Sequence, residues 1–179
     1  MSTLHTRASC ELEGTGGRNR NNVNADTPTG VYDIVDKDSW ISGGSRASYG
    51  PNPRLNLNPE SGEIKDTGRD LIRIHGGRQE KYNPQTGLWE PIKNAELKKT
   101  NGCMRCADVS VKTLKEITDI LMKNDSEEKA GKLTVVDDLV QTKDYSDIPF
   151  ISTTYKKPGK DASKEEKDQW SKLLNLIFK

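Results

Sequence analysis

Turn-forming residues are so dense in residues 42–68 that only short elements fit between them. The runs S-G-G-S, Y-G-P-N-P, N-P-E-S-G and D-T-G follow one another closely, with a short strand candidate at 54–57. Glycine, proline, asparagine and serine favour turns, so this spacing is typical of a chain of short strands. Only 31% of the residues are hydrophobic and the mean hydropathy is −0.85, which also favours a loop-rich β protein.

Alternating apolar residues predict the main strands. In G-V-Y-D-I-V-D, Tyr32 and Ile34 share one face while Val31 and Asp33 share the other. The run L-I-R-I-H-G-G alternates in the same way and ends in two glycines, which places His75 at the end of a strand. We expect later strands in G-K-L-T-V-V-D and F-I-S-T-T-Y.

Two runs have helical periodicity. The first follows the cysteine-containing segment, with Asp108 or Ser110 available as the N-cap. Its apolar stripe consists of Val111, Leu114, Ile117 and Leu121. The second begins near Ser163, where S-K-E-E has the form of a capping box. Its apolar residues, expected to pack on the domain, are Trp170, Leu173, Leu174, Ile177 and Phe178.

The chain of 179 residues fits one domain of the mainly β, α+β class. We expect an irregular N-terminal arm at 1–26, the domain at 27–157 and a packed helix at 158–179. The chain has 28 lysines and arginines and 27 aspartates and glutamates, so its net charge is too small to attract nucleic acid or an anionic membrane. The sequence has neither a membrane-spanning apolar stretch nor the h-region of a Sec signal, so we expect no stable membrane insertion.

The segment T-N-G-C-M-R-C contains two of the three cysteines and has three interpretations. A zinc site usually repeats such a pair, and the chain has no second C-x-x-C and no H-x-x-x-H. A thioredoxin-like redox pair follows a buried strand, whereas polar E-L-K-K-T-N-G precedes this one. Three cysteines cannot all pair within one chain, so at least one thiol is free unless it pairs between chains.

The third interpretation makes Cys103 a nucleophile and His75 its base. A cysteine is mostly thiol at neutral pH and needs an imidazole within reach to take its proton. Gly102 permits a sharp entry at which successive amides point at a developing oxyanion. The residues alone leave a structural cysteine and a satisfied loop histidine as an equal alternative.

The order of four segments resembles the catalytic domain of the L,D-transpeptidase, or YkuD-like, family. These segments are T-P-T-G-V-Y-D-I at 27–34, I-H-G at 74–76, T-N-G-C-M-R at 100–105 before a helix, and a strand near G-K-L-T-V-V. The resemblance covers roughly residues 27–139. It implies a mixed β-sandwich or barrel, with a helix after the catalytic cysteine and no metal or cofactor.

The resemblance also implies roles for individual residues. Cys103 becomes the nucleophile that attacks a carbonyl of a peptidoglycan stem peptide, and His75 becomes the general base, oriented by a carbonyl near Gly76. Amides around Gly102 and Cys103 form the oxyanion hole. The outcome is a 3-3 crosslink, an exchanged D-amino acid or L,D-carboxypeptidase action.

Four further features complete this prediction. Thr100 is expected to hydrogen-bond within the catalytic turn, and Arg105 to hold a substrate carboxylate or brace the loop. Asn101 stands where the family usually has histidine and keeps a hydrogen-bonding role. His75 and Cys103 lie 28 positions apart, which suggests that residues 82–91 are an insertion over the site.

This function requires action in the periplasm or cell wall. Because no Sec signal is evident, we expect export by another route or a signal removed beforehand, and a secreted antibacterial effector is one such use. The alternative is a non-enzymatic β domain that binds glycan or protein, with Cys103 and Cys106 in a disulfide or zinc site.

Overall fold

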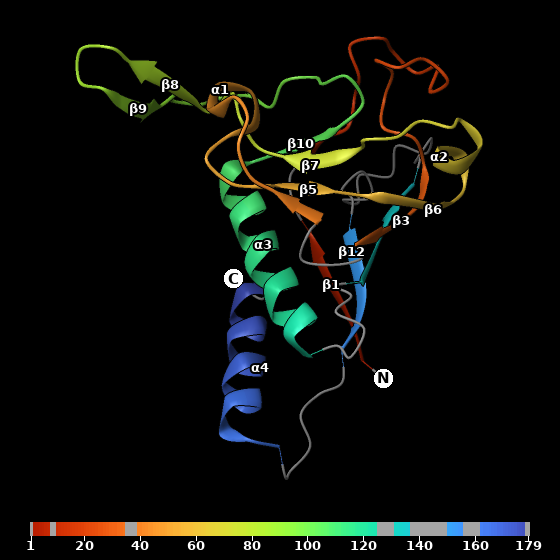
Figure 1. Cartoon of the computed structure of the whole chain (residues 1–179), viewed down its shortest axis with the longest axis vertical. Coiled ribbons are helices and arrows are strands. Elements are labelled where there is room, and N and C mark those ends of the chain that lie inside the picture. The colour runs from red at the N-terminus through yellow and green to blue at the C-terminus, as the bar shows by residue number, and fades with distance from the viewer. Residues whose placement is uncertain are drawn as a thin grey trace.

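The computed structural model describes residues 2–7, 10–34, 39–124, 131–136, 150–155 and 162–177. These residues form a mixed α+β fold with two five-stranded sheets, one two-stranded hairpin and four helices (Figure 1). The strands are β1 (Ser2–Arg7), β2 (Cys10–Glu11), β3 (Gly30–Ile34), β4 (Trp40–Ile41), β5 (Arg54–Asn56), β6 (Asn58–Ser61), β7 (Arg73–His75), β8 (Glu80–Asn83), β9 (Leu88–Pro91), β10 (Met104–Cys106), β11 (Gly131–Val135) and β12 (Phe150–Tyr155). The helices are α1 (Arg46–Tyr49), α2 (Glu63–Asp66), α3 (Asp108–Asn124) and α4 (Lys164–Ile177).

The first sheet has the order β1-β12-β11-β3-β6, with every neighbouring pair antiparallel. Tyr32 and Ile34 of β3 are fully buried while Val31 and Asp33 are partly exposed, which confirms the alternation read from the sequence. Leu133 and Val135 of β11 are buried beside them. Neither five-stranded sheet closes into a barrel among the described residues.

The second sheet has the order β2-β10-β7-β5-β4, and its β10–β7 pair is parallel. Four apolar residues lie side by side across it, and all are buried in the core. This row is Met104, Ile74, Leu55 and Trp40. Because side chains alternate along a strand, the residues next to them point to the opposite face. That face carries His75 and Arg105, and Cys103 immediately precedes β10.

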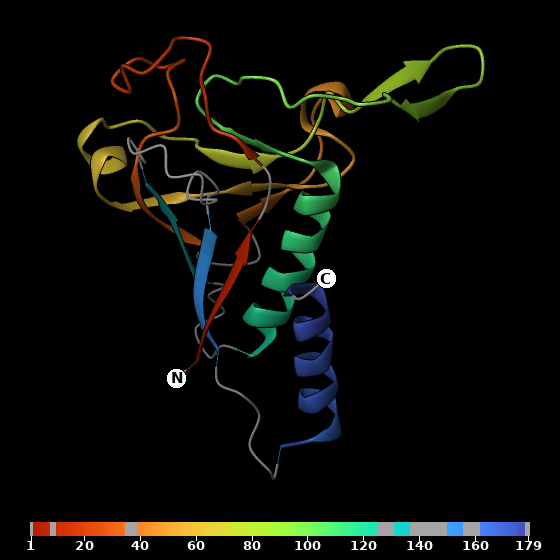
Figure 2. The ribbon, with the colours of Figure 1, turned by 180° about the vertical axis from the view of Figure 1, so that it is seen from behind.

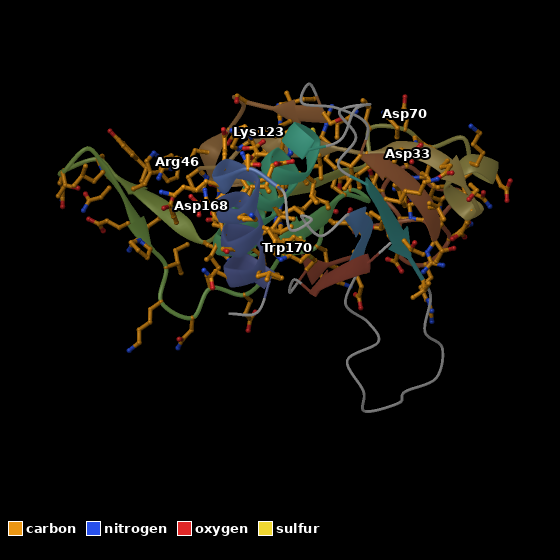
Figure 3. The ribbon with its side chains drawn as sticks, turned by 90° about the horizontal axis from the view of Figure 1, so that it is seen from below. Asp33, Arg46, Asp70, Lys123, Asp168 and Trp170 are labelled. Carbon is orange, nitrogen blue, oxygen red and sulfur yellow. A yellow bond between two sulfur atoms is a disulfide. The ribbon has the colours of Figure 1, made fainter. Side chains whose placement is uncertain are left out.

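Helix α3 closes the core, and α4 packs on α3 (Figure 2). The predicted stripe of α3 is buried, and Leu173 of α4 contacts its lower part with no exposed surface. Figure 3 shows α4 beside α3, with Trp170 on α4 and Lys123 near the end of α3. The capping box is also formed, because Ser163 and Glu166 exchange backbone-to-side-chain hydrogen bonds of 2.7 and 3.2 Å.

The start of α3 differs in detail from the prediction. Asp108 is the first helical residue rather than the N-cap, and its carboxylate accepts a 2.8 Å hydrogen bond from the amide of Gly77. The strand β10 lies between Cys103 and this helix. The sequence predicts the cysteine segment at or just before the helix N-terminus, and Cys103 lies before it, separated from it by β10.

Two further expectations need correction. Part of the N-terminal segment was expected to be irregular but forms strands. Strand β1 pairs along its length with β12, and β2 pairs with β10. Residues 12–29, here called the arm, are irregular as expected. Residues 82–91 lie in the β8–β9 hairpin rather than a loop over the site. The hairpin projects beyond α1, away from the β10–β7–β5 layer (Figures 1 and 2). None of the described helices is long and apolar enough to cross a membrane.

Candidate active site

His75 is buried at the end of β7, and a backbone carbonyl fixes its ring. Its side chain is only 3% exposed, and Nδ1 lies 2.7 Å from the carbonyl oxygen of Gly76. Since a carbonyl oxygen only accepts, Nδ1 carries the hydrogen and Nε2 keeps its lone pair. Tyr49 packs edge-on against the ring, with centroids 5.1 Å apart. The Gly76 carbonyl thus orients the imidazole in the way expected from the sequence.

The electrostatic surroundings keep this imidazole neutral. Burial lowers the pKa of His75 to about 4, and the positive charges of Arg105, Arg54 and Arg73 act in the same direction. The hydrogen bond to the Gly76 carbonyl only partly offsets this effect. At neutral pH His75 is therefore able to accept a proton at Nε2.

Gly76 lets the end of β7 lie against the start of α3. A Cβ atom at this position would sit 1.8 Å from Oδ1 of Asp108, far inside any allowed contact. The Gly76 amide also donates a 3.1 Å hydrogen bond to the carbonyl of Tyr49. These contacts hold α1, β7 and α3 together around the histidine.

Residues 100–103, here called the cysteine turn, are held by one hydroxyl. Thr100 Oγ1 donates to the carbonyl of Cys103 at 2.5 Å and accepts from the amide of Gly102 at 3.1 Å. Thr100 therefore hydrogen-bonds within the turn as expected. The same contacts correct one prediction, because the Gly102 amide is already occupied by Thr100. Of the two amides expected to form the oxyanion hole, only the amide of Cys103 is still predicted to do so.

Gly102 has no room for a side chain. Its φ is +99°, and a Cβ atom would lie 1.6 Å from Nη2 of Arg69. Arg69 in turn donates to the carbonyl of Asp26 at 2.8 Å, and Thr27 donates to the carbonyl of Gly102 at 3.2 Å. The sharp entry before Cys103 thus depends on both the glycine and the arm.

The arm lies directly against the cysteine turn, which the sequence did not predict. The amide of Thr15 donates to the carbonyl of Thr100 at 2.9 Å, and Thr15 Oγ1 donates to Asn101 Oδ1 at 3.0 Å. Asn101 is exposed and keeps the hydrogen-bonding role expected for it. A disulfide between Cys10 and Cys106 fastens the strand before the arm to β10. No local pattern signals a pairing between residues so distant in the chain.

Cys103 is the free cysteine, and its side chain is half-buried. Its Sγ lies 3.7 Å from the carbonyl oxygen of Leu71, a non-glycine residue with a φ of +56°. Burial raises the pKa of the Cys103 thiol, while the backbone amide of Arg73 and the nearby arginine charges oppose this rise. The group is therefore a thiol at neutral pH and needs a base to become a nucleophile.

Strand pairing brings Cys103 near the strand that carries His75. Arg105 lies directly beside His75 in the parallel β10–β7 pair, and Cys103 stands two residues before Arg105, immediately before β10 begins. Cys103 and His75 therefore lie on adjacent segments of the chain. No hydrogen bond joins them in this structure, where the sulfur faces Leu71 instead. Bonds between catalytic groups often tighten only when substrate binds, so this geometry is compatible with a thiol–imidazole pair.

Arg105 braces the loop that precedes the cysteine turn. Its Nη1 donates to the carbonyls of Lys98 and Lys99 at 2.7 and 3.3 Å, and the side chain is 6% exposed. Its Nε is buried without a hydrogen-bond partner. One of the two expected roles is thus observed, and carboxylate binding stays a prediction.

The alternative site at Cys103 and Cys106 is not formed. Cys106 is bonded to Cys10, so it is unavailable for a disulfide with Cys103 or for a zinc pair. The part of the chain described by the structure contains no group of three potential ligands among histidine, cysteine, aspartate and glutamate. A binding function for the β domain would have to use other residues.

In comparisons with known proteins, no family model, no curated protein and no solved structure matches this chain. Its function therefore has to be inferred from the chemistry of the site.

Proposed function

We propose that the chain is a cysteine acyltransferase of the L,D-transpeptidase type that acts on peptidoglycan stem peptides. The observation that carries this proposal is one free thiol, on the residue that precedes β10, and one buried, neutral imidazole at the end of the adjacent strand β7. The imidazole has its Nδ1 hydrogen fixed on a carbonyl and its Nε2 lone pair left for the reaction. Thr100 and the arm hold the turn that presents the thiol.

In the first half-reaction, Nε2 of His75 takes the proton from the Cys103 thiol as the sulfur bonds to the substrate carbonyl carbon. The amide of Cys103 stabilises the oxygen that becomes negative. The carbon–nitrogen bond then breaks, and the leaving amine receives the proton from Nε2. A pKa near 4 makes the protonated imidazole a strong acid, so it donates this proton readily.

In the second half-reaction, His75 deprotonates an acceptor that attacks the thioester carbonyl, the carbon–sulfur bond breaks, and the proton on Nε2 returns to the sulfur of Cys103. An amine acceptor gives a crosslink or an exchanged D-amino acid, and water gives carboxypeptidase action. The substrate belongs to the cell wall, so we propose that the protein acts in the periplasm or wall. An antibacterial effector would meet its substrate in the same place. The Cys10–Cys106 disulfide supports an oxidising compartment.

The experiment is incubation of the purified protein with a disaccharide-tetrapeptide from peptidoglycan, followed by chromatography and mass spectrometry. We expect release of the terminal D-amino acid, and its exchange when another D-amino acid is added. Cys103→Ala should give neither product at equal protein concentration. An unchanged tetrapeptide with wild-type protein, or equal product with Cys103→Ala, would reject the proposal.

A further inference from the structure

We infer that Arg54, together with Arg105, binds the free carboxylate of the amino acid that leaves during the reaction. The inference rests on the proposed function, since it names the substrate group that the site recognises. It assigns a specificity-determining role to a residue on β5, far from the cysteine turn in sequence.

Strand register places these two arginines on either side of His75. Arg105 pairs with His75 in the β10–β7 ladder. In the antiparallel β5–β7 ladder Leu55 pairs with Ile74, and continuing this register by one residue sets Arg54 opposite His75. Residues opposite one another on neighbouring strands project from the same face. His75 therefore stands on the strand between the two strands that carry these arginines.

Ring contacts connect Arg54 to the same place. The guanidinium carbon of Arg54 lies 4.4 Å from the centroid of the Tyr49 ring. Tyr49 also contacts the His75 ring, at 5.1 Å between centroids. Arg54 is thus positioned by an aromatic platform that is itself part of the histidine's surroundings.

The positive charges around His75 have no carboxylate partner among the described residues. Neither Arg54, Arg73 nor Arg105 forms an ion pair there, and the Nε atoms of Arg54 and Arg105 are buried without a hydrogen-bond acceptor. Glu11 lies opposite Arg105 on β2, but its Oε1 accepts from the amide of Glu13 at 2.8 Å. Buried guanidinium donors left unsatisfied are costly, and a carboxylate is the group that satisfies them best.

The chemistry of the leaving group explains where this anion comes from. His75 must deliver a proton to the nitrogen of the departing amino acid. The carboxylate of that amino acid is attached through a single carbon, so it falls beside the proton donor, between the two arginines. The site then requires a free α-carboxylate on the leaving residue and acts at the end of a stem rather than within a longer chain.

The test uses two tetrapeptide stems that differ only at the C-terminus, one ending in a carboxylate and the other in a carboxamide. Wild-type protein should show a higher kcat/KM for the carboxylate. Arg54→Gln should lower that value by about tenfold to a hundredfold, as expected for a lost charged hydrogen bond, with little effect on the carboxamide. Arg54→Lys keeps the positive charge but loses the paired donors of the guanidinium, so its kcat/KM for the carboxylate stem should lie between those of wild-type protein and Arg54→Gln. Equal losses on both stems would overturn the inference.

A matched control is Arg46→Gln, because Arg46 also lies over an aromatic ring but is ion-paired with Glu80 near the hairpin. It should keep the wild-type preference. A second readout needs no turnover: the His75 ring resonances of Cys103→Ala are followed during titration with D-alanine or D-alaninamide. Arg54-dependent shifts with D-alanine alone support the anion site even if stems are not processed. Stem turnover with no Arg54 dependence in either assay overturns the anion site and leaves the proposed function standing.

Discussion

At the residue scale, the proposed nucleophile is one thiol among three cysteines. Cys10 and Cys106 are joined in a disulfide, whereas Cys103 is free and half-buried. An alkylating reagent applied without a reductant should therefore modify Cys103 alone, and peptide mapping by mass spectrometry would locate the label. Modification of Cys10 or Cys106 in the native protein would show that the disulfide is not formed.

His75 should carry the proton transfers of the reaction. Replacing it with asparagine retains a donor for the Gly76 carbonyl but removes the base, so kcat should fall by about 10²–10⁴-fold. A tetrapeptide assay with a circular-dichroism check on folding measures this. Wild-type activity in a folded His75→Asn protein would exclude the histidine as base.

The low pKa of His75 also predicts how stability depends on pH. Between its ordinary value of 6.5 and about 4, the unfolded chain binds a proton here and the native protein does not. The free energy of unfolding should therefore fall as the pH drops through this window, by roughly 3 kcal/mol in total. Urea denaturation at several pH values would measure it. In His75→Asn the free energy of unfolding should not show this fall. The same dependence on pH in both proteins would contradict its assignment to His75.

Residue types and spacing made Cys103, His75, Gly102, Thr100 and Arg105 predictable as one group, because each belongs to a short motif. Arg54 was not predictable, since its place beside His75 arises only from the β5–β7 register. The occupied amide of Gly102 likewise depends on a side-chain rotamer of Thr100 that no sequence pattern specifies.

At the element scale, the arm and the disulfide hold the cysteine turn in place. The cysteines lie 96 positions apart, and closing such a loop restricts the unfolded chain. In the chain-entropy model this contributes up to roughly 4.7 kcal/mol, so Cys10→Ser/Cys106→Ser should lower the free energy of unfolding by about 2–4 kcal/mol. It should also reduce kcat, because β2 leads into the arm that contacts Thr100.

Chemical denaturation and the tetrapeptide assay would check both effects. Dithiothreitol should act on wild-type protein in the same way and leave the double variant unchanged. Stability and activity that are unaffected in the double variant would show that the arm holds the turn without the disulfide.

Elements with a local period were predictable, and those made by distant pairing were not. The stripe of α3, the capping box of α4 and the alternation in β3 follow from their own residues. Strand β1 forms by pairing with β12, which lies near the other end of the chain, and the two residues of β2 form by pairing with β10, which follows the cysteine turn. The hairpin of β8 and β9 was missed because its polar residues obscure the alternation of its strands.

At the scale of the whole molecule, the proposed activity depends on where the protein is. In the cytoplasm of a test bacterium it meets soluble precursors and a reducing environment, whereas behind an added export signal it meets the wall and keeps its disulfide. We expect growth and cell shape to be disturbed only by the exported protein, with changed muropeptides. Exported Cys103→Ala at the same level should be harmless, and harm from that variant would show that the toxicity does not arise from covalent catalysis.

In the proposed reaction Cys103 forms a thioester with a stem peptide. The most direct measurement is the intact mass of the protein after brief mixing with a tetrapeptide stem and quenching in acid, followed by mapping of the modified peptide. We expect a mass increase equal to the mass of the stem peptide minus that of the released amino acid, located on Cys103 and removed by hydroxylamine. Product formation with no adduct on Cys103, or the same adduct on the Cys103→Ala protein, would contradict it.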